Sequence, residues 1–143
     1  MPLYCTKQGM IDRFGQDELI QLTDRSNPPA DIIDDTVLNR AMDDADSVIN
    51  GYLSARYTLP LAIVPTALAR YAADIARFFL YDDSATERVE KAYEKAISFL
   101  KDVSKGIASV GTDQVGEKPA ESNQATIVSG GRIFGRGNTR GAF

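Results

Sequence analysis

The sequence has 143 residues, contains neither His nor Trp, and has a single cysteine, Cys5. Without His, Ser-His-Asp and Cys-His catalysis and imidazole metal ligands are excluded, and one cysteine excludes an intrachain disulfide or a thiolate zinc site. Apolar residues make up 43% and charged residues 25%, which is ordinary for a globular chain. No apolar run approaches the roughly 18 residues of a membrane span, so no membrane partner is expected.

Charge and glycine divide the chain into two parts. The net charge is -4, but residues 1–103 carry 11 Lys and Arg against 17 Asp and Glu, which leaves them at -6. Eight of the 11 glycines lie at or beyond Gly106. We therefore predict a helical domain over residues 1–105 and a C-terminal arm over residues 106–143 that is flexible or ordered by a partner.

Two short helices are predicted first. Thr6 is placed to cap the first helix, which runs to Phe14 and stops at Gly15. The second covers residues 18–22. Residues 23–30 form a polar turn region, because adjacent prolines there donate no backbone hydrogen bond and interrupt a helix.

Three longer helices follow. Apolar residues at helical spacing predict an amphipathic helix over residues 34–57. Residues 66–81 are apolar nearly all round, which is typical of a central helix, and residues 85–105 form a last helix capped by Ser84. The predicted fold class is therefore all-α, a small helical bundle of two short and three longer helices with an extended, Gly-rich C-terminal arm.

An apolar link, residues 59–64, joins the first two of these longer helices. Prolines at positions 60 and 65 prevent it from being helical, and it is too apolar to lie freely in water. Its cover is either the rest of the same chain or a neighbouring protomer, and the sequence favours neither. The candidate interaction residues here are Arg56, Tyr57, Leu59, Pro60 and Leu61.

The C-terminal arm contains further candidate interaction residues. Two apolar pairs and arginines that recur every four residues among glycines suit a segment that becomes ordered on another protein. These residues are Ile127, Val128, Arg132, Ile133, Phe134, Arg136 and Arg140. A phosphate loop is rejected because Arg136 and Gly137 stand where Lys and Ser or Thr are needed.

Few other residues suggest chemistry. Asp43, Asp44 and Asp46 point in different directions from a helix, so we interpret them as a solvated face rather than a cation site. The adjacent pair at positions 82 and 83 is interpreted as a helix end, and Cys5 as a partly buried small apolar residue. We predict no catalytic, cofactor-binding or metal-binding residue, and we do not expect an enzyme.

Several short motifs in a fixed order resemble one family. They are RFG at residues 13–15, DELIQLTD at 17–24, INGYL at 49–53 and RYTLPL at 56–61, followed by Pro65. Over about residues 3–103 the chain resembles the neck proteins of Mu-like phages and prophages, which are similar to the head-tail connector adaptors of tailed phages. The C-terminal arm receives little support from this resemblance.

The resemblance implies a structural subunit rather than an enzyme. Copies of the protomer would form a ring, expected to be dodecameric, beneath the portal protein, extend the DNA channel and support the next neck or tail protein. It also implies a place in the neck of the virion after synthesis in the host bacterial cytoplasm, and no cofactor.

The acidic domain agrees with such a channel. Double-stranded DNA would pass an acidic wall without specific binding, because like charge offers its phosphates no counterion release. The composition equally permits an alternative function, a helical regulatory module that binds a partner through its C-terminal arm.

Overall fold

The computed structural model describes residues 3–110, which form five α-helices and one short 3-10 turn. The predicted all-α class, with two short and three longer helices, is confirmed for these residues. The C-terminal arm from residue 111 onward lies outside them. The elements are α1 (Lys7–Phe14), α2 (Gln16–Thr23), α3 (Asp35–Leu53), α4 (Thr66–Tyr81), the 3-10 turn η1 (Asp82–Ser84) and α5 (Glu87–Ser104).

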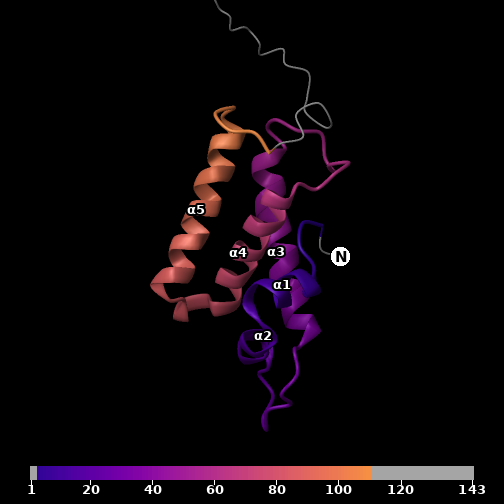
Figure 1. The fold of residues 1–143 in the computed structure, drawn as a ribbon, viewed down its shortest axis with the longest axis vertical. Helices are drawn as coiled ribbons and strands as arrows, with labels where there is room; N and C mark the ends of the chain where they lie inside the picture. The colour runs from indigo at the N-terminus through magenta and orange to yellow at the C-terminus, as the bar shows by residue number, and fades with distance from the viewer. Residues whose placement is uncertain (1–2, 111–143) are drawn as a thin grey trace, which may run out of the picture.

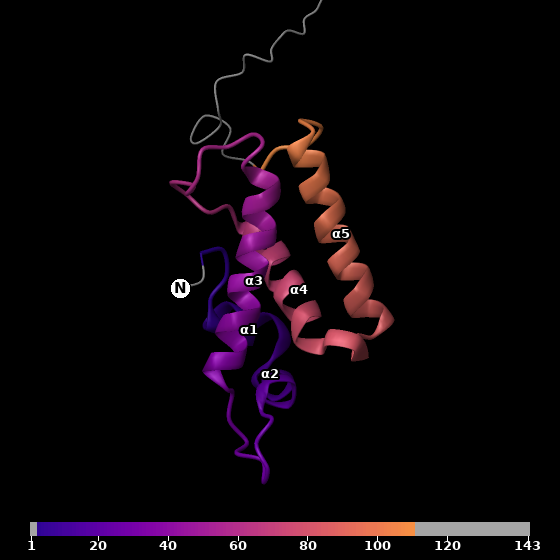
Figure 2. The same cartoon turned by 180° about the vertical axis from the view of Figure 1, so that it is seen from behind.

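The three longer helices form the body of the molecule (Figure 1). α4 packs against both α3 and α5, while α1 and α2 cover one end of the α3–α4 pair (Figures 1 and 2). Each long helix buries one apolar stripe, which stabilises the packing by removing that surface from water. The fully buried residues of these stripes include Leu38, Ile49 and Leu53 of α3, Leu68, Ala72 and Ile75 of α4, and Ala96, Leu100 and Val103 of α5.

α3 is shorter than predicted. It ends at Leu53 rather than near Tyr57, because the chain tightens into a turn in which the Tyr57 amide still donates to the Leu53 carbonyl over 2.8 Å. This turn carries the Tyr57 ring into the core, where it is 1% exposed. An apolar residue at helical spacing therefore belongs to the core without belonging to the helix.

The start of α5 also differs from the prediction. Thr86, not Ser84, is its N-cap, and the Thr86 hydroxyl accepts a hydrogen bond from the Val89 amide over 3.3 Å. Ser84 instead lies in η1 and donates to the Tyr81 carbonyl. Residues 82–84 form the 3-10 turn that follows α4. The residue that caps α5 therefore lies further along the chain, at Thr86.

One carboxylate that we interpreted as solvated is buried. Asp43 and Asp44 are exposed on α3, but Asp46 is 5% exposed. It accepts hydrogen bonds from the backbone amides of Leu3 and Tyr4, and so it fixes the start of the described chain against α3. Burial raises the pKa of Asp46, and these two hydrogen bonds oppose that rise.

Candidate interaction surfaces

The α2–α3 loop, residues 24–34, projects from one end of the molecule (Figure 1). Pro28 and Pro29 are exposed, and Ile32 is 64% exposed. Ile33 is the one buried residue of this loop. Most of its apolar side chains therefore face outward, where they contribute nothing to the core of the described chain.

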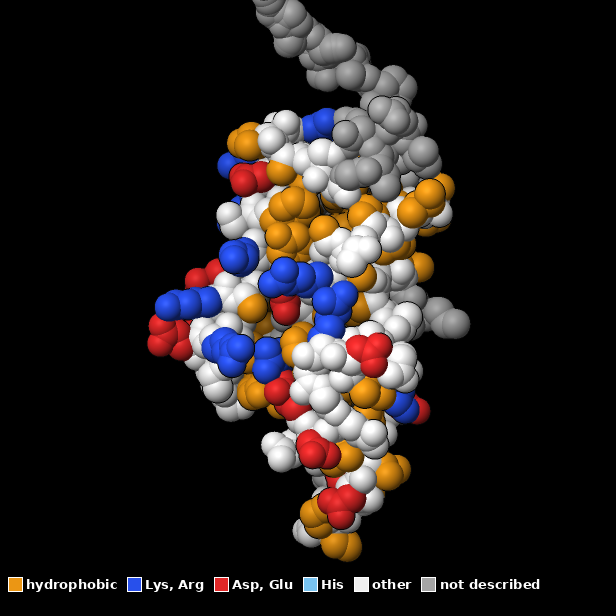
Figure 3. All heavy atoms as spheres, in the orientation of Figure 1, with side chains coloured by type: hydrophobic (Ala, Val, Ile, Leu, Met, Phe, Trp, Pro, Cys, Tyr) orange, Lys and Arg blue, Asp and Glu red, His pale blue; other side chains and the backbone are white. Residues whose placement is uncertain are grey.

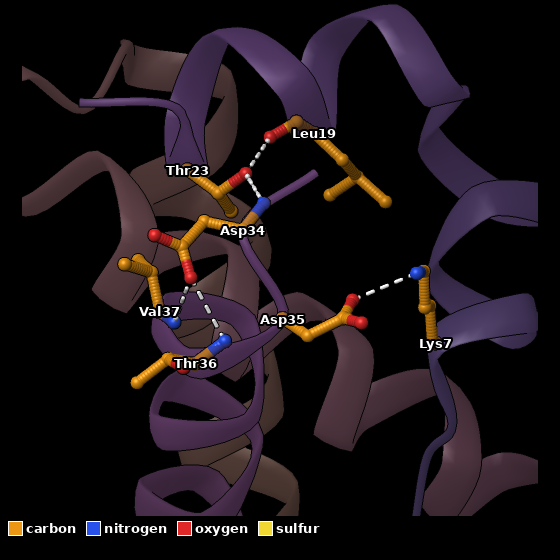
Figure 4. Close-up of polar contacts among 7 residues, drawn as sticks. All are labelled: Lys7, Leu19, Thr23, Asp34, Asp35, Thr36 and Val37. Atoms are coloured by element: carbon orange, nitrogen blue, oxygen red, sulfur yellow. Dashed lines mark hydrogen bonds and ion pairs between the residues drawn. The ribbon is translucent and has the colours of Figure 1, made fainter. Parts of the chain in front are cut away.

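Side-chain hydrogen bonds hold the base of this loop (Figure 4). The Thr23 hydroxyl donates to the Leu19 carbonyl over 2.7 Å and accepts from the Asp34 amide over 2.9 Å. Asp34 then caps α3 by accepting from the amides of Thr36 and Val37. One buried hydroxyl thus joins the end of α2 to the start of α3.

Asp24 holds the middle of the same loop. Its carboxylate accepts from the backbone amides of Ser26, Ala30 and Asp31 over 3.1, 2.8 and 2.7 Å. These hydrogen bonds lower the pKa of Asp24 because they stabilise its charged form. The loop is therefore ordered mainly by its own polar contacts, with Ile33 as its one buried side chain.

The α3–α4 loop, residues 54–65, contains the predicted apolar link. Unlike the α2–α3 loop, it is held by buried side chains. Tyr57 and Leu61 are buried, and the Tyr57 hydroxyl accepts from the Val110 amide over 3.2 Å. Ile63 and Val64, by contrast, are 62% and 38% exposed. The described chain therefore covers only part of the link.

The predicted interaction residues at this loop separate into two kinds. Tyr57 and Leu61 are buried within the protomer, so they shape the loop, and Leu59 is half-buried. Pro60 is exposed, and Arg56 is half-buried beside Gly106. The candidates in the C-terminal arm lie outside the described residues: Ile127, Val128, Arg132, Ile133, Phe134, Arg136 and Arg140.

Gly106 allows the chain to leave α5 and pass Arg56. Its φ of +82° lies in the region that favours glycine, and a Cβ there would be 2.5 Å from Nη1 of Arg56. The chain then turns back, so that Val110 is buried against Tyr57. The first residues after α5 thus pack on the α3–α4 loop.

A third surface is a groove between α4 and α5, with a cavity volume of about 660 Å³. Tyr71 and Phe99 stack in it with ring centroids 4.7 Å apart. Lys and Arg side chains gather over these helices (Figure 3). We call it the charged groove, and its lining consists of Arg70, Tyr71, Asp74, Lys91, Ala92, Lys95, Ser98, Phe99 and Asp102.

Asp74 lies in this groove among cations. Burial raises its pKa, and the positive charges of Arg70, Arg77, Arg13 and Lys95 act in the opposite direction. The cations come from three helices, α1, α4 and α5. The fold therefore assembles a basic face on a domain whose sequence is acidic overall.

Arg77 ties this face to the N-terminal helices. It makes a two-pronged ion pair with Glu18 of α2, with N–O distances of 2.6 and 2.9 Å, and its guanidinium lies 4.4 Å from the centre of the Phe14 ring. Paired arginine and carboxylate groups of this geometry are among the stronger polar contacts in proteins. The guanidinium of Arg77 therefore already has its charge partner within the protomer, and in this it differs from an exposed cation.

Few of the described side chains are suited to metal binding or nucleophilic catalysis. Residues 3–110 contain no group of three or more His, Cys, Asp or Glu side chains able to hold a metal ion. Cys5, which we predicted to be partly buried, belongs to the buried core, and burial followed by the negative charge of Asp46 raises the pKa of its thiol to about 12. The thiol is therefore protonated at neutral pH and is a poor nucleophile. None of the helices in this part of the chain has the length and apolar character needed to cross a bilayer.

The fold and surfaces define an all-α protein with exposed apolar loops at both ends and a charged groove along its side. Residues 4–129 match the family described as Bacteriophage Mu, Gp36. The chain is 35% identical over 141 residues to the Mu-like prophage FluMu protein gp36 of Haemophilus influenzae, covering 99% of each chain. It is 30% identical over 134 residues to Gene product J of Escherichia phage Mu, covering 93% of this chain and 94% of that one. The chain belongs to the Mu Gp36 family, and it is a phage protein.

The α2–α3 loop and the charged groove were not among the interaction surfaces that the sequence predicted. A signal for the groove exists, because Arg70, Asp74 and Arg77 share one face of α4 by helical spacing, and Lys91 and Lys95 share one face of α5. Whether these two helix faces line one groove depends on how α4 packs against α5. That arrangement is a property of the tertiary structure.

Proposed function

We propose that the chain is a non-enzymatic structural subunit of the phage neck, an adaptor between head and tail. Copies of it form a ring, expected to be dodecameric, that binds beneath the portal protein. The ring extends the DNA channel and supports the next neck or tail protein. The protein then resides in the neck of the virion and requires no cofactor.

The distribution of exposed apolar side chains carries this proposal. Four of the five large apolar side chains that are exposed in the described chain lie in or beside the two end regions: Ile32, Ile63, Val64 and Ile107. The α2–α3 loop forms one end of the molecule, and the α3–α4 loop with the end of α5 forms the other (Figure 1). Exposed apolar surface at two opposite ends suits a protein that joins two partners.

The charge of the domain supports a position around DNA. Residues 1–103 carry a net charge of -6, so a channel wall made from the acidic part of their surface repels phosphates. DNA that slides through such a channel gains nothing from counterion release and does not adhere. Membership of a phage family is consistent with this role.

The proposal is tested with the portal protein of the same phage. The full-length chain is mixed with purified portal rings, and the particles are imaged by electron microscopy. We expect an additional ring on the narrow end of the portal, and no added ring with an Ile63→Ser, Val64→Ser variant that still folds. A bare portal at saturating concentrations of the unchanged chain contradicts the proposal.

A further inference from the structure

The charged groove has the form of a receptor for a small segment of another protein. Its volume of about 660 Å³ lies within the roughly 300–1,000 Å³ of clefts that hold ligands. Tyr71 and Phe99 are half-buried, so their stacked rings still offer apolar surface to an incoming side chain. A partner that fits would bring at least one apolar residue.

The charges around this groove favour an acidic partner. Arg70 and Lys95 are exposed cations, and the only carboxylates in the lining are Asp74 and Asp102. Lys91 adds a third cation at the edge, where it pairs with Glu87 in an exposed contact of little strength. The groove therefore presents surplus positive charge beside aromatic surface.

The α2–α3 loop has the complementary properties. It exposes Ile32 next to the exposed carboxylate of Asp31, and its three aspartates outnumber its one cation, Arg25. The hydrogen bonds of Asp24 order it in advance, so little conformational freedom remains to be lost on binding. Such a loop suits insertion into a cleft.

The loop and the groove of one chain do not meet. The loop projects from the far end of α3, away from α5, in both views of the fold (Figures 1 and 2). Thr23 and Asp34 anchor its two ends at that position. A contact between these surfaces therefore requires two copies of the chain.

We propose that the α2–α3 loop of one copy inserts into the charged groove of the next copy. Ile32 packs against Tyr71 and Phe99, and Asp31 faces Arg70 and Lys95. Because the two surfaces differ, every copy offers one loop and one groove, and repetition of the contact generates a ring when the rotation closes. This inference rests on the proposed ring and names the surfaces that join its subunits.

Occupation of the groove also agrees with a channel for DNA. The cations of the groove would hold phosphates if they faced a DNA channel, whereas a neighbouring loop covers them. The competing occupant of the groove is DNA itself. Cross-linking and the salt dependence of DNA binding distinguish these two occupants.

Cross-linking tests the contact directly. An Ile32→Cys variant and a Ser98→Cys variant of the full chain are mixed at high concentration and oxidised with copper-phenanthroline. We expect a covalent dimer from the mixture, and a ladder of larger products from the chain that carries both changes. Cys5 does not compete, because its thiol is buried with a pKa raised to about 12.

A matched control places the cysteine elsewhere. Ser47 is exposed on α3 and lies outside the lining of the groove, so Ser47→Cys mixed with Ile32→Cys should give no dimer above background. Equal cross-linking of Ser47→Cys and Ser98→Cys would overturn the proposed pairing.

Charge exchange gives a second, independent readout. Asp31→Lys and Lys95→Glu each weaken self-association roughly tenfold by sedimentation, and the chain with both changes returns to within about threefold of the original. Both positions are exposed, so the fold is expected to persist, as checked by circular dichroism. A double variant as weak as the single ones overturns the inference.

The outcomes separate this inference from the proposed function. If rings form on the portal without the Ile32–Ser98 cross-link, the pairing of loop and groove is wrong and the adaptor function stands. If the cross-link forms but no ring attaches to the portal, the pairing stands and the adaptor function fails. Salt-sensitive binding of duplex DNA that Lys95→Glu abolishes, without any cross-link, assigns the groove to DNA and overturns the inference.

Discussion

The two loops that flank α3 are held in opposite ways. The α2–α3 loop keeps its shape through hydrogen bonds of Thr23 and Asp24. The α3–α4 loop is held by Tyr57 and Leu61, whose side chains are buried in the core. Both loops still expose large apolar side chains, which a helical domain of this size does not need for its own stability.

An exposed apolar loop can therefore depend on the packing of the core or be largely independent of it. A loop anchored by buried rings is lost only when the core is damaged. A loop anchored by carboxylate and hydroxyl groups can be loosened by one substitution or by protonation while the helices remain.

Removal of the Tyr57 ring should have the largest effect. Tyr57→Ala should lower the free energy of unfolding by about 3–5 kcal/mol, because the ring is 1% exposed and leaves a cavity. Tyr57→Phe keeps the ring but leaves the buried Val110 amide without its acceptor, at a cost of about 1–2 kcal/mol. Urea unfolding followed by circular dichroism measures both. Equal losses for the two variants would show that the hydroxyl, rather than the ring, anchors the loop.

Removal of the Thr23 hydroxyl should have a smaller effect. Thr23→Val keeps the shape of the side chain but loses the hydrogen bonds to Leu19 and Asp34, at a cost of about 1–2 kcal/mol. Hydrogen exchange of the Asp34 amide should accelerate more than that of amides in α5. Thr58→Val is the control, because Thr58 is exposed in the α3–α4 loop and should leave stability unchanged. A Thr23→Val chain as stable as the control contradicts the account of this loop.

Acid should loosen one loop and spare the other. The pKa of Asp24 is lower in the folded chain than its ordinary value of 3.8, so its contribution is complete above pH 3.8 and is lost as pH falls through the folded pKa. The NMR amide signals of Ala30 and Asp31 should therefore titrate with a midpoint below 3.8, and the Val110 signal should not follow them. A midpoint above 3.8 would mean that the hydrogen bonds of Asp24 do not stabilise its charge.

Change at the exposed tip of the α3–α4 loop should have the smallest effect on stability. Ile63→Ser should alter the free energy of unfolding by less than about 0.5 kcal/mol, because the side chain is 62% exposed. Leu61→Ser, two residues earlier, is the matched contrast, since Leu61 is 9% exposed and its loss should be clearly destabilising. Thermal unfolding compares the pair, and similar losses would place Ile63 in the core.

Apolar periodicity predicted most of the fold, and the missed features depend on contacts between distant residues. The positions of the five helices follow from local spacing, but the end of α3 depends on where the Tyr57 ring packs. The burial of Asp46 could not be predicted from α3 alone, because its partners are the amides of Leu3 and Tyr4, more than 40 residues away. Local spacing carries no information about such partners.

The candidate surfaces were predicted only in part. The apolar link was identified from its composition, and the structure shows that Tyr57 and Leu61 are anchors whereas Ile63 and Val64 are exposed. The charged groove required the packing of α4 on α5, which places the cations of two helices side by side. Its polar and aromatic residues each have an ordinary explanation when their own helix is considered alone.

Cryo-electron microscopy of intact virions tests the proposal that the chain forms an adaptor ring in the phage neck. We predict a ring between the portal and the tail into which the helices of residues 3–110 fit, with neighbouring copies in contact. Density for another protein at that position, together with the absence of this chain from purified virions by mass spectrometry, would show that the chain is not a neck subunit.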